Sequence, residues 1–406
     1  MKVLVVGSGG REHTLARALV RSPRLSELHA APGNPGIARH ARCHPVRSED
    51  VDGLVELCRA FRIDLAVVGP EAPLVVGAAD ELRRAGVAVF GPGASAARIE
   101  GSKSFAKEVL QAAGVPTAAR LDEARAPCVV KADGLAAGKG VFVCRTQEEA
   151  DGAMPRARAF GGEIVIEELL EGEEVSVFAL CDGERALAFP AAQDYKRAFD
   201  GDAGPNTGGM GAYSPVPGLG PTEVEDLVEA VHRPVLAELA RRGAPFVGAL
   251  YAGLMLTPGG PRVLEFNCRF GDPETQAIVP RLECDLLELL AAAAAGDLSG
   301  LEVSVSPACA VTVVLTSRGY PETSEIGVEI GGIEDAEGTG ALVFHAGTAL
   351  REDALLTAGG RVLDVTALGD SCAQARERAY AAVERIHFPG AHYRRDIALK
   401  AVHVSI

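Results

Sequence analysis

The chain has 406 residues, of which 48% are hydrophobic, and it contains no tryptophan. A chain of this length is expected to form about two to four domains. Its 40 basic and 55 acidic residues give a net charge of −15, which argues against a nucleic-acid partner because phosphate backbones require clustered Lys and Arg. No stretch reaches the roughly 18 apolar residues of a membrane span, and the sequence MKVLVVGSGG does not have the pattern of a signal peptide. Small phosphorylated ligands remain compatible with this composition, since they need only a few local cations and backbone N–H groups.

The chain has nine cysteines, spread from Cys43 to Cys372 without a CxxC pair. This usage predicts a cytoplasmic chain with reduced, buried thiols. His40, Cys43 and His44 lie close together, but no second ligand pair follows at zinc spacing, so we interpret them as an ordinary loop.

Residues 1–100 alternate short apolar runs with helical patterns. The runs KVLVVG (2–7), DLAVVGP (64–70) and VAVFGP (87–92) predict strands, and helical segments lie between them. Strands alternating with helices predict a parallel sheet covered on both faces, with ligands at the carboxyl ends of the strands. The loops GSGGREH (7–13) and GPEAPL (69–74) are expected at that edge.

The loop GSGGREH is a poor dinucleotide fingerprint. Gly7 and Gly9 fit the first two glycines, but Glu12 occupies the third position, and no acidic residue follows at the distance of a ribose partner. A bound phosphate or sugar fits the loop better than NAD does, and a tight turn without a ligand remains an alternative.

From Ser102 the pattern changes. The segment 102–114 predicts a helix capped by Ser102 and ended by Gly114. Closely spaced strand patterns follow and predict an antiparallel lid over about 115–186. Next come a helix at 222–242, two strands, an alanine-rich helix from about 284, and a β-rich segment closed by a helix at 371–386. We therefore expect an α/β and α+β multidomain chain, divided into 1–101, 102–300 and a β-rich 301–406.

The segment VLEFNCRF (263–270) carries a row of polar residues. In a strand Glu265, Asn267 and Arg269 would share one face, because alternate side chains point the same way. The two oxygen-bearing side chains suit Mg²⁺, and the guanidinium suits phosphate oxygens. The alternative is a solvated face on which Arg and Glu pair with each other.

The segment KADGLAAGKG (131–140) resembles a P-loop but fails its pattern. Only three residues separate Gly134 from Gly138, and Gly140 follows Lys139 where the pattern requires Ser or Thr. A strand follows instead of a helix, so we predict a glycine-rich hairpin able to fold over phosphates. The alternative is a flexible hairpin with a surface lysine.

Two further segments are candidates for ligand binding. IVIEELLEGEEVS (164–176) places acidic residues directly after an apolar strand, where they could accept hydrogen bonds from an adenine amino group and a ribose, although such residues are usually only solvated. The glycine-rich loop DAGPNTGGMGAYSP (202–215) could bind a small zwitterion, with Asp194 or Asp202 at its ammonium group.

Taken in order, these motifs resemble those of the ATP-grasp ligases, and within them the phosphoribosylamine–glycine ligases. The resemblance runs essentially from end to end and includes VGSGGREH, VGPEAPL, EGSKSF, VVKADGLAAGKGV, GPNTGGMGAYSP, EFNCRFGDPETQ and HAGT. It implies an ATP-grasp fold with an N-terminal parallel α/β domain. It also implies ATP-dependent ligation of glycine to 5-phosphoribosylamine through a glycyl phosphate, with Mg²⁺ or Mn²⁺. No obligate protein partner is evident.

The resemblance also implies roles for individual residues. The residues expected to bind ATP are Lys103, Lys131, Asp133, Gly134, Gly138, Lys139, Gly140, Glu167, Leu170 and Glu174. The residues expected to bind glycine or phosphoribosylamine are Gly9, Gly10, Glu71, Asp194, Asp202, Asn206, Thr207, Arg269 and Arg394. Glu265 and Asn267 are the expected metal ligands, and Lys131 and Arg269 the expected catalytic residues.

The chain departs from the family pattern at three places. The segments 120–129 and 149–164 are shorter than usual, which predicts a trimmed lid, and Ala398 replaces a usual glycine. The strand before the metal strand offers no carboxylate. The alternatives are another ATP-grasp ligase, against which the GPNTGGMGAYSP loop argues, and a nucleotide-binding protein without catalysis. The retained polar residues argue against the latter.

Overall fold

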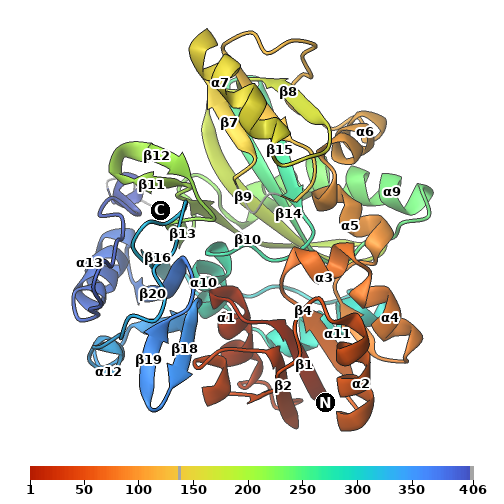
Figure 1. Ribbon diagram of the computed structural model, residues 1–406. Helices are drawn as coiled ribbons and strands as arrows, with labels where there is room; N and C mark the ends of the chain where they lie inside the picture. The colour runs from red at the N-terminus through yellow and green to blue at the C-terminus, as the bar shows by residue number, and fades with distance from the viewer. Residues whose placement is uncertain (136–138, 403–406) are drawn as a thin grey trace.

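The computed structural model describes residues 1–135 and 139–402 of the chain. Its N-terminal part is a parallel sheet of order β3-β2-β1-β4-β5, covered by helices on both faces, as predicted (Figure 1). The apolar runs at 2–7, 64–70 and 87–92 form β1, β4 and β5. The strands are β1 (Lys2–Gly7), β2 (Glu27–Pro32), β3 (Arg42–Cys43), β4 (Leu65–Val68) and β5 (Ala88–Phe90). The helices are α1 (Gly10–Leu19), α2 (Val51–Phe61), α3 (Glu71–Val75), α4 (Ala78–Arg84) and α5 (Ala94–Gly101).

Helix α6 (Lys103–Ala113) leads from this domain into the next. The Ser102 hydroxyl caps it by accepting a hydrogen bond from the Phe105 amide at 3.2 Å, and Gly114 ends it with φ of +69°. Both ends therefore form where the sequence predicts them.

A small sheet of order β7-β6-β8 forms the lid at the top of Figure 1. It consists of β6 (Cys128–Ala132), β7 (Val141–Cys144) and β8 (Ile164–Glu168), with α7 (Gln147–Arg158) packed on it. The lid is shorter than the predicted 115–186, because the next two strands pair elsewhere. Strands β6 and β7 pair antiparallel, as expected, and Gly138 lies outside the described residues.

The largest sheet is antiparallel and has the order β15-β14-β9-β10-β13-β16-β20-β17. Its strands are β9 (Glu173–Asp182), β10 (Ala186–Asp194), β13 (Gly211–Ser214), β14 (Val247–Thr257), β15 (Gly260–Asn267), β16 (Cys309–Thr316), β17 (Leu342–His345) and β20 (Arg361–Gly369). Two hairpins lie beside it, β11 (Arg197–Phe199) with β12 (Ala203–Asn206), and β18 (Thr348–Arg351) with β19 (Ala354–Thr357). Because β13 pairs with β16, the central part of the chain and its C-terminal part share one continuous sheet.

The remaining helices cover this sheet. They are α8 (Pro221–Leu227), α9 (Arg233–Arg241), α10 (Glu274–Ile278), α11 (Leu286–Ala295), α12 (Ile333–Glu337) and α13 (Cys372–Val383). A π-helical turn over Val228–His232 joins α8 to α9, so the helix predicted at 222–242 is continuous but irregular. No helix in the described part of the chain is long and apolar enough to cross a membrane.

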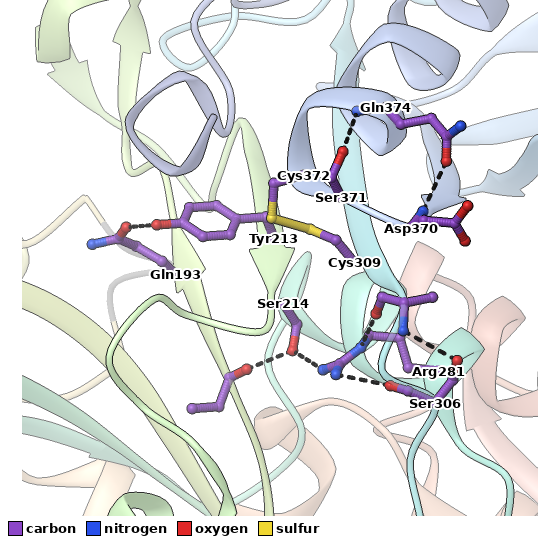
Figure 2. Close-up of a disulfide and its surroundings, with 12 residues drawn as sticks. Gln193, Tyr213, Ser214, Arg281, Ser306, Cys309, Asp370, Ser371, Cys372 and Gln374 are labelled. Carbon is purple, nitrogen blue, oxygen red and sulfur yellow. Dashed lines mark hydrogen bonds between the residues drawn. A yellow bond between two sulfur atoms is a disulfide. The ribbon is translucent and has the colours of Figure 1, made fainter. Parts of the chain in front are cut away.

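The C-terminal core contains a disulfide between Cys309 on β16 and Cys372 at the start of α13, shown in Figure 2. The expectation that all nine thiols are reduced is therefore wrong at these two positions. The other seven cysteines are free, and most of them are buried. The spacing of 63 residues contains no pattern that would have indicated the pair, since only the packing of α13 on β16 brings the two together.

Candidate active site

A cleft of about 840 Å³ lies between the lid, the large sheet and the N-terminal domain. Most residues that the sequence predicts to bind ligands line it, although they come from segments as far apart as α3 and β15. These are Glu71, Lys103, Lys131, Gly134, Gly140, Glu167, Leu170, Glu174, Asp194, Asp202, Asn206, Thr207, Glu265, Asn267 and Arg269. The cleft contains both positive and negative side chains, as a site for phosphates and a metal requires.

Glu167 on β8 joins two lysines on one wall of the cleft. Its carboxylate lies 2.7 Å from Nζ of Lys131 and 2.8 Å from Nζ of Lys107, and its side chain is almost fully buried. Lys131 also donates to the carbonyl oxygen of Leu264 at 3.0 Å. The structure therefore shows Glu167 positioning Lys131, a contact that the sequence analysis missed, as it missed Lys107. Acceptance of an adenine hydrogen bond by Glu167 stays a prediction.

Asp133 links the lid hairpin to the start of α6. Its carboxylate accepts hydrogen bonds from the amide of Lys103 at 2.5 Å and from that of Gly134 at 2.9 Å. The Lys103 ammonium donates to the carbonyl oxygen of Gly134 at 2.9 Å, so the hairpin and the helix are tied twice. Asp133 is thus a positioning residue in this structure, and its contact with ATP stays a prediction. Lys139 is exposed and does not line the cleft.

Glu265 and Asn267 lie near the end of β15 and face the cleft, as predicted for metal ligands. Burial by itself raises the pKa of Glu265, but Lys196, Lys131 and Lys103 more than offset this effect and lower the pKa to about 2. Lys196, which the sequence analysis did not identify, lies 3.3 Å from Glu265 and also pairs with Glu174. A permanently ionised carboxylate beside an amide oxygen suits Mg²⁺.

Arg269 follows β15 and lies between two carboxylates. Its Nε is 3.1 Å from Glu71, and its Nη2 is 3.1 Å from Glu100. Burial alone raises the pKa of Glu71, but Arg269 and Arg11 reverse the effect and lower it to about 2. The alternative of a solvated Arg–Glu face is excluded, because the Arg269 side chain is only 17% exposed and faces the cleft.

The loop at 202–215 is held by its own polar side chains. Asn206 donates to the carbonyl oxygen of Val141 in the lid at 3.0 Å, and Thr207 donates to that of Lys196 at 3.0 Å. Asp194 is half-buried, and its Oδ1 atom is buried without a hydrogen-bond partner among the described residues. Burial and the neighbouring Glu274 raise its pKa well above the usual value. An ammonium group bound here would satisfy Asp194.

Comparison with known proteins assigns the whole chain to one family. The profiles of the phosphoribosylglycinamide synthetase N domain, ATP-grasp (A) domain and C domain match residues 1–100, 101–275 and 310–400. The chain belongs to the phosphoribosylamine–glycine ligase family. Two relatives, the phosphoribosylamine–glycine ligases of Streptomyces coelicolor and Mesorhizobium japonicum, are 51% and 49% identical to it, with 99% of each chain covered.

Solved structures agree with this assignment. The phosphoribosylamine–glycine ligase of Thermotoga maritima is 35% identical, with a TM-score of 0.84 over 98% of this chain and 100% of that one. The biotin carboxylase domain of the Hydrogenobacter thermophilus 2-oxoglutarate carboxylase is only 17% identical, with a TM-score of 0.71 over 96% of this chain and 91% of that one, and shows the fold alone. The predicted ATP-grasp fold is confirmed.

Arg394 was predicted to bind substrate, but in this phosphoribosylamine–glycine ligase fold it lies outside the lining of the cleft. It is fully buried, and its guanidinium pairs with Asp396 at 2.6 Å and Asp202 at 2.9 Å, over the ring of Tyr195. It therefore orders the base of the 202–215 loop, and Arg394 does not line the cleft. Asp202 is already paired with Arg394 and with Lys400, so Asp194 is the better candidate for an ammonium partner.

Gly9 and Gly10 also lie outside the lining of the cleft. The Gly9 amide donates to Glu12 at 2.6 Å, which explains the acidic residue at the third fingerprint position. A Cβ on Gly10 would lie 1.8 Å from Oδ2 of Asp364, so α1 approaches the C-terminal domain too closely for any side chain there. Cationic residues that do line this end of the cleft are Arg11 and Arg361. Neither was predicted from the sequence, because neither is part of a recognisable phosphate motif.

Proposed function

We propose that this protein uses ATP to join glycine to 5-phosphoribosylamine, giving glycinamide ribonucleotide, ADP and phosphate. The observation that carries this proposal is the gathering of Lys103, Lys131, Glu265, Asn267 and Arg269 around one cleft in a chain about half identical to enzymes of that name. A carboxylate is a poor electrophile, so ATP first phosphorylates glycine, and the amine then attacks the glycyl phosphate.

The phosphoryl-transfer half of the reaction depends on charge. Lys103, Lys131 and Arg269 line the cleft, and we expect the two lysines to contact the ATP phosphates and Arg269 to face the transferring group. Fixed cations stabilise the charge that spreads over the phosphoryl oxygens in the transition state. Glu167 keeps Lys131 in place before ATP arrives, which lowers the cost of reorganisation.

Glu265 and Asn267 fit a divalent cation of the Mg²⁺ type. Among the described residues no cluster of three or more His, Cys, Asp and Glu forms a self-sufficient metal site. Two oxygen ligands completed by substrate phosphates match the usual mode of Mg²⁺ binding. When bound, the ion would neutralise phosphate charge. This chain would supply the two oxygens, and Lys196 holds the carboxylate of Glu265.

Glycine and the amine would bind on opposite sides of Arg269. Asp194 offers a buried acceptor for the glycine ammonium group, beside Gly209, where a Cβ would lie 2.8 Å from its Oδ1. Glu71, Arg11 and Arg361 line the end of the cleft toward the N-terminal domain, where we expect phosphoribosylamine. We also propose a cytoplasmic location, because these charged metabolites do not cross membranes unaided.

The test is to supply ATP, Mg²⁺, phosphoribosylamine and one amino acid at a time, and to measure ADP release. We expect release with glycine at least about tenfold above that with alanine or no amino acid, because one extra methyl group in a tight pocket can cost that much. Equal release with alanine would contradict the substrate. Release with a carboxylate other than an amino acid would indicate a different ATP-grasp ligase.

A further inference from the structure

One carboxylate fixes both ends of Arg269. Glu100, in the last turn of α5, accepts a hydrogen bond from Nη2 of Arg269 at 3.1 Å through one oxygen. Its other oxygen accepts from the amide of Cys268, the residue just before Arg269, at 2.7 Å. The same side chain therefore holds the backbone from which Arg269 starts and the guanidinium in which it ends.

The two acidic partners of Arg269 differ in their surroundings. The side chain of Glu100 is 8% exposed, whereas that of Glu71, at the first position of α3, is 25% exposed. Burial raises the pKa of Glu100, and Arg269 acts against this effect. A buried ion pair whose carboxylate also binds the backbone restricts the motion of the Arg269 side chain more than a partly exposed pair does.

The hydrogen bonds of Arg269 leave part of its guanidinium free. Of its five N–H groups, Nε donates to Glu71, one on Nη1 donates to the carbonyl oxygen of Phe270, and one on Nη2 donates to Glu100. Among the described residues, one N–H group on each terminal nitrogen has no acceptor, and such groups can bind a carboxylate or phosphate. Glu100 thus takes one N–H group of the guanidinium while two others stay available for a ligand.

We propose that Glu100 is a positioning residue, which holds the Arg269 guanidinium toward the acyl phosphate and so sets the rate of the chemical step. This role rests on the proposed function, because it requires Arg269 to contact the transferring group. Glu100 also lies two residues before Ser102, the cap of α6, whose first residue is Lys103. Glu100 therefore lies between Arg269, which it binds, and Lys103 at the start of α6.

The kinetic test compares Glu100→Gln, Arg269→Lys and the double variant. The Cys268 amide and the Arg269 guanidinium each donate to a different oxygen of Glu100. A glutamine has only one oxygen, and its NH₂ group is itself a donor, so it cannot accept from both. We expect kcat to fall about 10- to 100-fold in Glu100→Gln, with the KM for ATP changed less than about threefold. In the Arg269→Lys background, Glu100→Gln should add less than about twofold, since Glu100 acts through Arg269. An equal loss in both backgrounds would overturn the proposal.

Two further variants control for folding. Glu100→Asp keeps both oxygens on a shorter chain and should recover part of kcat. Glu108→Gln changes an exposed glutamate on α6 and should leave kcat and Tm unchanged. If Glu100→Gln does not fold, Glu100→Asp is placed in the same double-variant comparison, with the same criterion.

A chemical readout separates this proposal from the proposed function. Phenylglyoxal modification of Arg269, followed by peptide mass spectrometry without substrates, should be at least about fivefold faster in Glu100→Gln than in the unsubstituted protein, because the side chain is released. An unchanged rate would contradict the positioning role even if the enzyme makes glycinamide ribonucleotide. Faster modification without glycine-dependent ADP release would instead refute only the function.

Discussion

Lys196 forms ion pairs with two carboxylates that line the cleft. It pairs with Glu174 and Glu265, and although burial alone would lower its pKa, those carboxylates raise it well above the usual value. Lys196 therefore stays protonated and keeps Glu265 ionised. The sequence analysis identified Asp194 but not Lys196 two positions later, because a single lysine in a loop carries no local signal.

The ionisation of Glu265 leads to a prediction about metal dependence. Its pKa of about 2 lies below the unfolded value of 4.5, so the carboxylate is charged in both states above about pH 5, and its contribution to stability is lost only as pH falls toward 2. The Mg²⁺ concentration giving half-maximal activity should therefore be constant from about pH 6 to 8. In Glu265→Gln it should rise at least about tenfold.

This prediction has a matched control in Glu171→Gln, which changes an exposed glutamate near the cleft. The measurement is ADP release across a Mg²⁺ titration at three pH values. A normal Mg²⁺ requirement in Glu265→Gln would exclude this residue as a ligand.

At the scale of elements, the local patterns predict the strands well but not the sheets to which they belong. The run at 174–181 forms β9, yet β9 pairs with β14, about 70 residues away, and not with the lid. An apolar alternating run has the same appearance in either sheet, so its partner depends on long-range pairing. The capping of α6 was predictable because Ser102 and Gly114 act within one turn.

The connection between the lid hairpin and α6 is also testable. Asp133→Ala removes the single oxygen, Oδ1, that accepts from both amides, so the hairpin should lose its link to the start of α6. We expect the KM for ATP to rise about 5- to 10-fold, a loss of about 1 kcal/mol in binding. The KM for glycine should change less than about twofold.

Asp151→Ala on the exposed face of α7 serves as the control for this variant. Steady-state kinetics with each substrate varied in turn gives the comparison. Equal increases for ATP and glycine would show that Asp133 supports the general fold and not the nucleotide side of the cleft.

At the scale of the whole molecule, the N- and C-terminal domains meet through histidines. The amide of His345 donates to Nδ1 of His13 at 2.8 Å, and Asn34 donates to the carbonyl oxygen of His345 at 2.8 Å. The motifs GREH and HAGT, more than 300 residues apart, are therefore structural partners. A salt bridge between Arg39 and Glu337 continues the interface.

This interface should weaken at acidic pH. Burial, with a smaller effect of Arg39, lowers the pKa of His345 to about 4, so the folded state favours the neutral ring. Stability is then lost as pH falls below the unfolded value of 6.5, and the loss reaches about 2 kcal/mol at pH 5. Calorimetry of His345→Asn should show a smaller fall in Tm between pH 7 and 5 than the unsubstituted protein shows. An identical fall would contradict the role of His345 in the acid sensitivity.

The disulfide gives a second prediction at this scale. Closing a loop of 63 residues restricts the unfolded chain by about 4 kcal/mol, so reduction or Cys309→Ala should lower the Tm of the C-terminal transition by several degrees. Thiol titration of the denatured protein should count seven thiols before reduction and nine after it. Nine thiols before reduction would show that Cys309 and Cys372 are not joined in solution.

The sequence by itself determined the fold class, the family and much of the cleft. Glu265 and Asn267 were predictable because strand alternation puts their side chains on one face, whereas Lys103 and Lys131 were predicted from the motifs shared with the family. The tertiary structure alone decided the partners of these residues: Glu167 with Lys131, Glu100 with Arg269, and Arg394 with Asp202. The physical reason is that a buried charge must find an opposite charge in space, and that neighbour is chosen by packing between elements distant in the chain.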